Sequence, residues 1–374
     1  MSTLDALATP SLLLDLDRAK RNAALIGRRV RSLGARLRPH IKTHKCIEVA
    51  RLQTAEGFAG VTVSTLAEAR TFAANGFDDI TYAVPIERGK FEAAAALARD
   101  GARLSLITDD PSVPGPLAEA ARRAGVTFDV LVKVDCGYHR CGVDPEGPQL
   151  PELVHRIGER TALRFAGLLT HAGHSYHARS VAAVRVIAAA ERDVMCAAAA
   201  RLADAGIAVP IVSVGSTPTI THVDHLEGVQ EVRAGNYIFH DVTQVALGTC
   251  AIDQCVLSVL ASVVQRSAVQ RHVVLDAGAI ALSKDRGPVE LDATAGYGRV
   301  CALDGADLGL RVASVSQEHG VVPVADPAML ERLTVGTRVR VLVNHSCLTA
   351  AQHAEYAVHE GMDVVDRWAI HRGW

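Results

Sequence analysis

The sequence lacks the features that mark membrane-spanning, secreted or nucleic-acid-binding proteins. Aromatic residues make up only 4% of its 374 residues and the net charge is −2, which argues against a base-stacking platform or a strongly basic surface. No apolar run reaches the roughly 18 residues that cross a bilayer. The apolar run at residues 11–16 has no basic stretch before it, so no signal peptide is expected. We therefore expect a cytoplasmic protein without a membrane or nucleic-acid partner.

The cysteines follow neither a disulfide framework nor a zinc-finger pattern. Eight of them are scattered over the whole chain, and no Cys-x-x-Cys motif occurs. Small secreted proteins, in contrast, crowd their cysteines into a short sequence. We therefore expect reduced thiols, most of them buried packing residues.

Short apolar runs alternate with stretches of helical periodicity in the first two thirds of the chain. This strict alternation predicts parallel strands joined by right-handed crossovers. Eight repeats in about 240 residues match the size of a (β/α)₈ TIM barrel, and a doubly wound open sheet is the alternative. The predicted strands are residues 37–42, 60–64, 79–84, 104–108, 128–134, 165–170, 210–214 and 230–233.

The pattern changes after about residue 250, where strand-like runs follow one another with turn signals between them. We predict that the barrel spans residues 8–250 and that a second, mostly antiparallel β domain spans residues 251–374, against which the N-terminal residues 1–7 could also pack. The strand-like runs are residues 255–265, 272–277, 310–316, 338–343 and 355–359.

A lysine ends the first predicted strand. In a parallel barrel, functional residues lie at the carboxyl ends of the strands, and period-two alternation places His40 and Lys42 on the same inward side. We expect Lys42 to be desolvated and close to the cations Arg38 and Lys45, which lowers the pKa of its amine to that of a usable nucleophile. A rim lysine paired with a carboxylate is the alternative.

The turns after the seventh and eighth strands have the composition of a phosphate site. Gly215–Thr219 and Ala234–Asn236 offer small side chains, hydroxyl groups and backbone N–H groups, although such a turn can also simply cap a helix. The phosphate site of this fold usually lies at these two strand ends. A lysine across the barrel mouth from a phosphate site is the arrangement that pyridoxal 5'-phosphate (PLP) requires.

A second constellation lies in the predicted β domain. His345 and Cys347 are two residues apart at the end of a predicted strand, so they face the same side. Imidazole with thiolate favours Zn²⁺ over Mn²⁺ or Mg²⁺. Two protein ligands leave positions for water or substrate, as in an open catalytic site. A half-buried histidine beside a structural cysteine is the alternative.

With these residues in hand, the chain resembles the D-serine dehydratase/D-threonine aldolase family of fold-type III PLP enzymes, which is related to alanine racemase through the barrel. The matching motifs run over most of the length. They include RPHIKTHK at 38–45, THAGHSY at 170–176, GSTPT at 215–219, RAGNYIFHD at 233–241, LDAGAIALSKDRG at 275–287 and NHSCLTAAQH at 344–353.

The resemblance implies a role for each matching position. Lys42 would be the Schiff-base lysine, and His174 and Tyr176 would complete the catalytic group near the ring and substrate. His345 and Cys347 would hold the divalent metal, and a homodimer would form. The residues implied in cofactor binding are Lys42, His40, Arg140, Tyr176, Ser216, Thr217, Gly235 and Asn236.

Cys347 favours dehydration, because family members that cleave D-threonine tend to have Asp at this position. We expect a PLP- and zinc-dependent D-serine dehydratase that forms pyruvate and ammonia, with Lys42 taking the α-proton and the metal assisting loss of the β-hydroxyl. The alternatives at the same site are dehydration of D-threo-3-hydroxyaspartate and retro-aldol cleavage, as in D-threonine aldolase or 3-hydroxy-D-aspartate aldolase. A racemase, and a non-catalytic PLP-binding carrier protein, also remain open.

Overall fold

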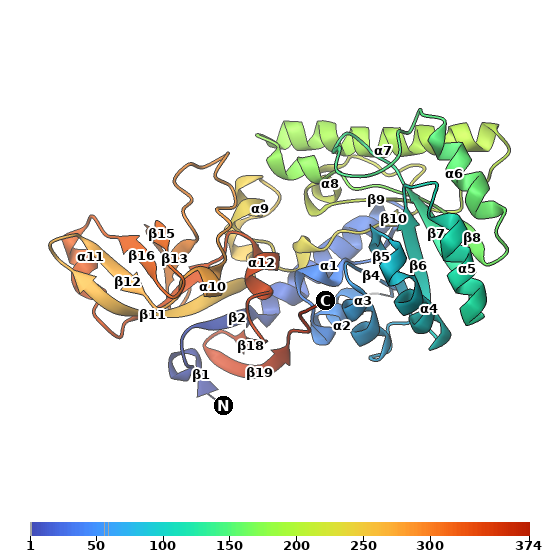
Figure 1. Cartoon of the computed structure of the whole chain (residues 1–374). Helices are drawn as coiled ribbons and strands as arrows, with labels where there is room; N and C mark the ends of the chain where they lie inside the picture. The colour runs from blue at the N-terminus through green and yellow to red at the C-terminus, as the bar shows by residue number, and fades with distance from the viewer. Residues whose placement is uncertain (1, 56, 59) are drawn as a thin grey trace. The chain divides into compact units, whose positions relative to one another are not determined.

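The computed structural model describes residues 2–55, 57–58 and 60–374 (Figure 1). Two compact units make up the chain. The barrel unit consists of Leu25–Lys42, Gln53–Gly235 and Gly373–Trp374, and the β unit of Met1–Ala24, Thr43–Leu52 and Asn236–Arg372. The ranges expected from the sequence, 8–250 and 251–374, change at residue 250, whereas these units change at Gly235. Met1, in the expected range 1–7, lies outside the described residues.

The barrel unit contains an eight-stranded sheet in which every neighbouring pair of strands is parallel. A parallel bridge between His40, just after β3, and Thr62 of β4 joins the first strand to the last, so the sheet closes on itself. The predicted barrel is therefore confirmed and the open sheet is excluded. The strands, in sheet order, are β3 (Arg36–Leu37), β10 (Glu231–Val232), β9 (Val212–Val214), β8 (Leu163–Leu169), β7 (Phe128–Lys133), β6 (Arg103–Thr108), β5 (Asp79–Pro85) and β4 (Val61–Val63).

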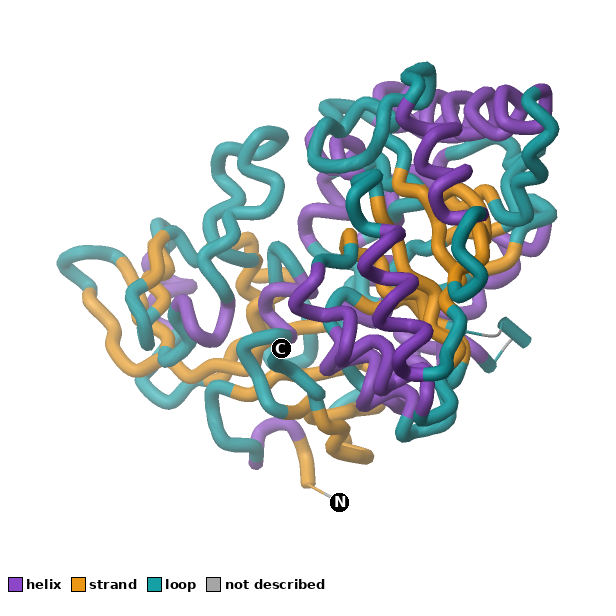
Figure 2. The backbone as a smooth tube through the Cα atoms, turned by 45° about the vertical axis from the view of Figure 1, so that its right-hand side comes forward, coloured by secondary structure: helices purple, strands orange, loops and turns teal. Residues whose placement is uncertain are grey.

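Helices follow the strands and lie outside them (Figure 2). Local sequence fixes several helix ends: Thr65 and Glu68 form a capping box at the start of α3, and Gly125 ends α5 in the left-handed conformation. Helices and 3₁₀ helices in this part of the chain are α1 (Leu16–Ser32), η2 (Ile41–Thr43), α2 (Ile47–Thr54), α3 (Leu66–Ala73), η3 (Arg88–Lys90), α4 (Phe91–Arg99), α5 (Pro114–Ala124), α6 (Gln149–Gly158), η4 (Gly173–His177), α7 (Val181–Asp204) and α8 (Thr217–His222).

A buried polar network crosses the strands of the barrel. The Arg38 guanidinium donates to Glu231 at 2.7 Å and to Asp79 at 2.6 Å, and Ser213 donates to the other oxygen of Glu231 at 2.8 Å. Arg233 donates to Ser213 and to the backbone carbonyl of Thr170. Because buried charges are costly unless paired, this network fixes the relative positions of the strand ends that it joins.

The β unit is built on a mostly antiparallel sheet, as predicted, and among its described strands only the pair β2–β18 is parallel. Leu12–Leu14 of β2 are buried and pair with β11, which is why this N-terminal segment belongs to the β unit. Its strands are β1 (Ser2–Thr3), β2 (Ser11–Asp15), β11 (Leu257–Ser267), β12 (His272–Leu275), β13 (Arg299–Ala302), β14 (Asp307–Arg311), β15 (Ser314–Val315), β16 (Gly320–Pro323), β17 (Arg338–Leu342), β18 (Glu355–Glu360) and β19 (Asp363–Ala369).

Short helices connect these strands. They are η1 (Leu4–Ala6), η5 (Asn236–Ile238), α9 (Val242–Ala246), η6 (Ile252–Gln254), α10 (Ala279–Leu282), α11 (Pro327–Arg332) and α12 (Ser346–Ala350). Among the described residues, no helix combines the length and the apolar character needed to cross a membrane. None of the eight cysteines forms a disulfide bond in the described structure.

Candidate active site

Lys42 lies in the 3₁₀ helix η2, after the bridge residue His40, rather than in a strand. The predicted strand 37–42 is therefore too long, because β3 ends at Leu37 and only His40 continues the pairing. The Lys42 side chain is exposed, so the predicted desolvation is wrong. Arg38 is not an uncompensated cation near it either, since Glu231 and Asp79 neutralise its charge.

Positive charge nevertheless gathers around Lys42 in the barrel unit. Burial, followed by the charges of Lys42 and Lys133, holds the pKa of His171 well below its ordinary value. Lys133 ends β7 and is buried, and burial together with the charge of Arg233 lowers its pKa to about 8. Arg140 adds a further positive charge that acts on both groups. This region suits an anionic ligand, and His171 is neutral at pH 7.

The loop after β8 carries His174 and, two residues later, Tyr176, both in η4 and both half-buried. The rings of His174 and Tyr138 lie 6.0 Å apart, and the Arg140 guanidinium lies 5.1 Å from the Tyr138 ring centre. Burial lowers the pKa of His174. Its Nδ1 atom is buried without a hydrogen-bond partner among the described residues, so it is suited to a ligand group.

A buried carboxylate holds two loops of this site. Glu191 projects from α7, and its Oε1 atom accepts hydrogen bonds from the backbone N–H of Ala172 at 2.9 Å and of Gly215 at 3.1 Å. The hydroxyl groups of Ser175 and Ser216 lie 3.0 Å apart and join the same two loops. Glu191 therefore fixes the loop after β8 against the loop after β9.

The structure separates the predicted phosphate ligands into two groups. The Ser216 hydroxyl caps α8 by accepting from Thr219 N–H at 3.3 Å, and Ser216 N–H donates to Thr219 Oγ1 at 3.1 Å. The capping alternative therefore describes Ser216. Thr217, the first residue of α8, and Gly235, after β10, are buried at the predicted strand ends. They remain the candidates for phosphate binding.

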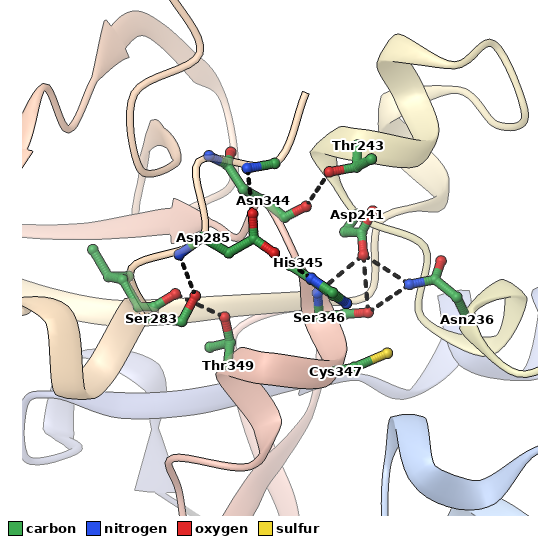
Figure 3. A network of polar contacts seen from close by, with 12 residues as sticks. Asn236, Asp241, Thr243, Ser283, Asp285, Asn344, His345, Ser346, Cys347 and Thr349 are labelled. Atoms are coloured by element: carbon green, nitrogen blue, oxygen red, sulfur yellow. Dashed lines mark hydrogen bonds and ion pairs between the residues drawn. The ribbon is translucent and has the colours of Figure 1, made fainter. Parts of the chain in front are cut away.

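Asn236 begins η5 in the β unit, where its side chain joins a polar network (Figure 3). Its Nδ2 atom donates to Asp241 Oδ2 at 2.7 Å and to Ser346 Oγ at 3.0 Å. Asp241 Oδ2 also accepts from the Ser346 backbone N–H at 3.0 Å. Because these contacts use the amide nitrogen, and the amide oxygen can only accept, we leave only the backbone of Asn236 as a candidate phosphate group.

The predicted metal pair lies at the start of α12, and not on a strand as expected. His345 precedes the helix, and its Nδ1 atom lies 2.5 Å from Asp285 Oδ2. Cys347, in the first turn, contacts Thr43 Oγ1 at 3.5 Å, and Thr43 follows Lys42 in the sequence. Burial alone would lower the pKa of His345, but hydrogen bonds with Asp285 and Cys347 raise it to about 11.

These two side chains fit an open metal site. They are hydrogen-bonded to each other, and they supply one imidazole and one thiol, which suit a borderline metal ion. Among the residues that the structure describes, no group of three or more His, Cys, Asp or Glu side chains is placed to hold a metal. His345 and Cys347 would therefore be the protein ligands, and water or substrate would complete the coordination.

Comparison with known proteins covers both units. Residues 14–242 match the family model of the alanine racemase N-terminal domain, and residues 256–359 match that of the putative serine dehydratase domain. The D-threo-3-hydroxyaspartate dehydratase of Delftia sp. is 40% identical over 377 residues, which cover 100% of this chain and 99% of the relative. The chain belongs to the D-serine dehydratase/D-threonine aldolase family. The D-serine dehydratase of Dictyostelium discoideum is 32% identical, with 99% and 98% of the two chains covered.

A solved structure of a family member is also very similar. It is a cysteine-to-alanine variant of D-threo-3-hydroxyaspartate dehydratase in the metal-free form, with a TM-score of 0.97, 39% identity and complete coverage of both chains. PLP is the cofactor expected of this alanine-racemase-like family. Homologues in the family are PLP-dependent dehydratases and aldolases, which are lyases, and the chain is an enzyme of this type.

Several residues of the site were not singled out from the sequence. His171 lies within a quoted family motif, and Asp285 lies in the motif at 275–287. Lys133 is a lone lysine that ends an apolar strand, a weak but readable signal. Asp241 ends the motif at 233–241, whereas Glu191 stands in an Ala-rich helix and gives no sequence signal of its role.

Proposed function

We propose that this enzyme is a PLP- and zinc-dependent dehydratase of D-β-hydroxy amino acids that converts D-serine to pyruvate and ammonia. The observation that carries the proposal is the His345–Cys347 pair. The imidazole is held through Nδ1 by Asp285 and is hydrogen-bonded to the thiol of Cys347. A cysteine at this position, in a family whose aldolases tend to have Asp, favours loss of the hydroxyl group over retro-aldol cleavage.

Separate sets of residues would hold PLP and the zinc ion. The Lys42 amine would carry PLP, with its phosphate on Thr217, Gly235 and the backbone of Asn236, and His345 and Cys347 would hold the zinc ion. When bound, PLP supplies an electron sink for charge at the substrate α-carbon, and zinc supplies a Lewis acid for the departing hydroxyl. Two observations support this assignment: the His174 Nδ1 atom has no hydrogen-bond partner in the part of the chain that the structure describes, and positive charges lie near Lys42.

The protein's own groups then have distinct tasks. Lys42 Nζ accepts the α-proton of the substrate, as a general base whose amine is exposed and accessible. Lys133 and Arg140 attract the carboxylate of the substrate. The depressed pKa of His171 keeps its ring neutral, so His171 adds hydrogen-bonding capacity without adding a third fixed charge. His174 and Tyr176 would orient the ring and the substrate.

The second candidate substrate is D-threo-3-hydroxyaspartate. It is favoured by a specific observation, the 40% identity over the full length to a dehydratase of that compound. The same proton transfer and the same loss of hydroxyl would then give oxaloacetate instead of pyruvate. The two substrates differ only in the group on the β-carbon, so they require the same residues at the α-carbon.

The test is a product analysis with D-serine, D-threonine and D-threo-3-hydroxyaspartate as substrates. We expect a 2-oxo acid and ammonia, with activity abolished in Lys42→Ala and lost after chelation until zinc is restored. Lys20→Ala, an exposed lysine paired with Glu360 at 3.3 Å, is the control that keeps full activity. Glycine with an aldehyde as the products, or full turnover by Lys42→Ala, would contradict the proposal.

The proposal includes a cytoplasmic homodimer. The eight cysteines are scattered along the chain instead of crowded as in disulfide-rich secreted proteins, which supports a reducing compartment. The homodimer rests on the family resemblance alone. Sedimentation of the holoenzyme tests it directly, and a single species of about 40 kDa, the mass of one chain of 39.6 kDa, would contradict it.

A further inference from the structure

The Nδ1 atom of the His345 ring contacts a carboxylate from a distant part of the sequence, that of Asp285 (Figure 3). Asp285 lies in the loop after α10, and its two oxygens have separate partners. Oδ2 lies 2.5 Å from His345 Nδ1, and Oδ1 accepts from Gly287 N–H at 2.7 Å. The contact with Gly287 therefore fixes the orientation of the carboxylate independently of its contact with the imidazole.

The loop that carries Asp285 is itself locked in place. Gly287 has φ +57°, and a Cβ atom there would lie 2.7 Å from Asn344 Cβ and 2.7 Å from Thr243 Oγ1. Only glycine fits this close approach and this left-handed backbone. On the other side of Asp285, its own N–H donates to Ser283 Oγ at 3.2 Å. The loop therefore packs directly against Asn344, the residue before His345.

A buried carboxylate, that of Asp241, holds the backbone next to the imidazole. Asp241 Oδ2 accepts from both the N–H and the hydroxyl of Ser346, at 3.0 and 3.1 Å, and Asp241 Oδ1 accepts from Gln244 N–H at 3.0 Å. Thr349 Oγ1 donates to the carbonyl of Leu282 at 3.0 Å and ties α12 to α10. These contacts hold the backbone from His345 to Cys347 in place, and Asp285 fixes the orientation of the His345 imidazole ring.

We propose that Asp285 is the positioning residue of the metal site. It accepts the Nδ1–H of His345, so the proton released to solvent when a divalent cation binds is the one on Nε2, and that nitrogen joins the Cys347 thiolate as a ligand. Carboxylates that accept from the second ring nitrogen of a histidine ligand orient the ring and raise its basicity. The inference rests on the proposed function only in that His345 and Cys347 bind the metal.

The test measures zinc affinity of the PLP-loaded holoenzyme by competition with a chromogenic chelator, independently of turnover. We expect Asp285→Ala to bind Zn²⁺ 10- to 100-fold more weakly than the wild type, the usual effect of removing such a partner. Asp285→Asn keeps the shape of the side chain and loses the charge, and we expect an intermediate loss. PLP content and the thermal unfolding midpoint report whether each variant is folded.

Asp292→Asn is the matched control, because it removes the same charge from the same connecting segment. Its carboxylate accepts from Thr294 N–H at 2.9 Å and from the Thr294 hydroxyl at 2.6 Å. We expect wild-type zinc affinity for it. A further readout is the spectrum of the Co²⁺-substituted protein: the thiolate charge-transfer band of Cys347 should persist in Asp285→Asn, while the ligand-field bands change because the imidazole is displaced.

His345→Ala separates failure of this inference from failure of the proposed function. If the wild type binds Zn²⁺ and His345→Ala does not, while Asp285→Ala and Asp285→Asn bind as the wild type does, the positioning role is overturned and the metal site stands. If His345→Ala binds Zn²⁺ as tightly as the wild type, the metal assignment in the proposed function is overturned, and this inference with it.

Discussion

Replacing Glu191 with alanine should weaken both the fold and the binding of PLP. The variant removes the acceptor of two buried backbone N–H groups, those of Ala172 and Gly215. A buried donor left without a partner costs about 1–3 kcal/mol, so the two together cost about 2–6 kcal/mol. The loops after β8 and β9, which carry His174 and Thr217, lose their common anchor at the same time.

The surrounding cavity sets where in that range the result should fall. A small cavity of about 10 Å³ adjoins Glu191 and is lined also by Gly215 and Thr219, and this is close to the smallest space that holds one water molecule. Removing the carboxylate enlarges it, so a water molecule can enter and recover one hydrogen bond. We therefore expect the lower half of the range. Glu191→Gln keeps an acceptor oxygen and should cost less than the alanine variant.

The assays are equilibrium unfolding and PLP titration of the reconstituted enzyme. If loss of the anchor destabilises the PLP-bound state by about 1.4 kcal/mol more than the PLP-free state, the Kd for PLP rises tenfold. Glu152→Ala is the control, since Glu152 forms an exposed pair with Arg156 at 2.8 Å, and such pairs contribute under about 1 kcal/mol. The reasoning is refuted if Glu191→Ala costs no more than Glu152→Ala and leaves the Kd for PLP unchanged.

Two further predictions concern the barrel. Glu231→Gln leaves the buried Arg38 guanidinium without this counter-charge and should cost about 3–5 kcal/mol of unfolding free energy at pH 7. Burial raises the pKa of Glu231, but the charge and hydrogen bond of Arg38 outweigh burial and hold the pKa below its ordinary value. The stability advantage of the wild type is therefore present above about pH 4.3 and disappears as the pH falls through the folded-state pKa, which denaturant titrations at several pH values measure. Gly173→Ala places a Cβ atom 2.3 Å from the Tyr138 ring; it should cost about 1–3 kcal/mol of stability and perturb the PLP absorption spectrum. Gly158→Ala is the control, because its Cβ atom meets nothing within 4 Å at the end of α6, and it should stabilise the protein by about 0.4–1 kcal/mol. Equal unfolding midpoints for the two variants would contradict this prediction.

The barrel could be predicted because its signals are local and repeated. Each predicted strand overlaps an observed one, since a strand buried on both faces must be a short apolar run, such as 128–134 for β7 (Phe128–Lys133). The β unit was harder. β13 (Arg299–Ala302) and β19 (Asp363–Ala369) were not predicted, because β13 has only four residues and most positions of β19 are exposed, so neither gives a long apolar run.

The candidate site shows the same division between local and long-range information. Residue type and spacing were enough to select Lys42, His345 and Cys347, because the amine, imidazole and thiol are rare chemical groups at strand ends. Spacing gave the wrong local structure for two of them: Lys42 lies in a 3₁₀ helix and Cys347 in an α-helix, whereas His345 has the expected extended backbone just before that helix. Period-two alternation applies only where the backbone is extended, and here the strands end before the functional residues begin.

The sequence by itself determined the alternating core of the barrel, the family and the chemical groups that the reaction requires, because these depend on residue types and on separations of a few positions. Only the tertiary structure decided which carboxylate each of them meets. Asp285 is 60 residues from His345 in the chain, and Glu191 reaches two loops that follow different strands. Such pairs form only after the backbone has folded, and no local pattern of side chains encodes them.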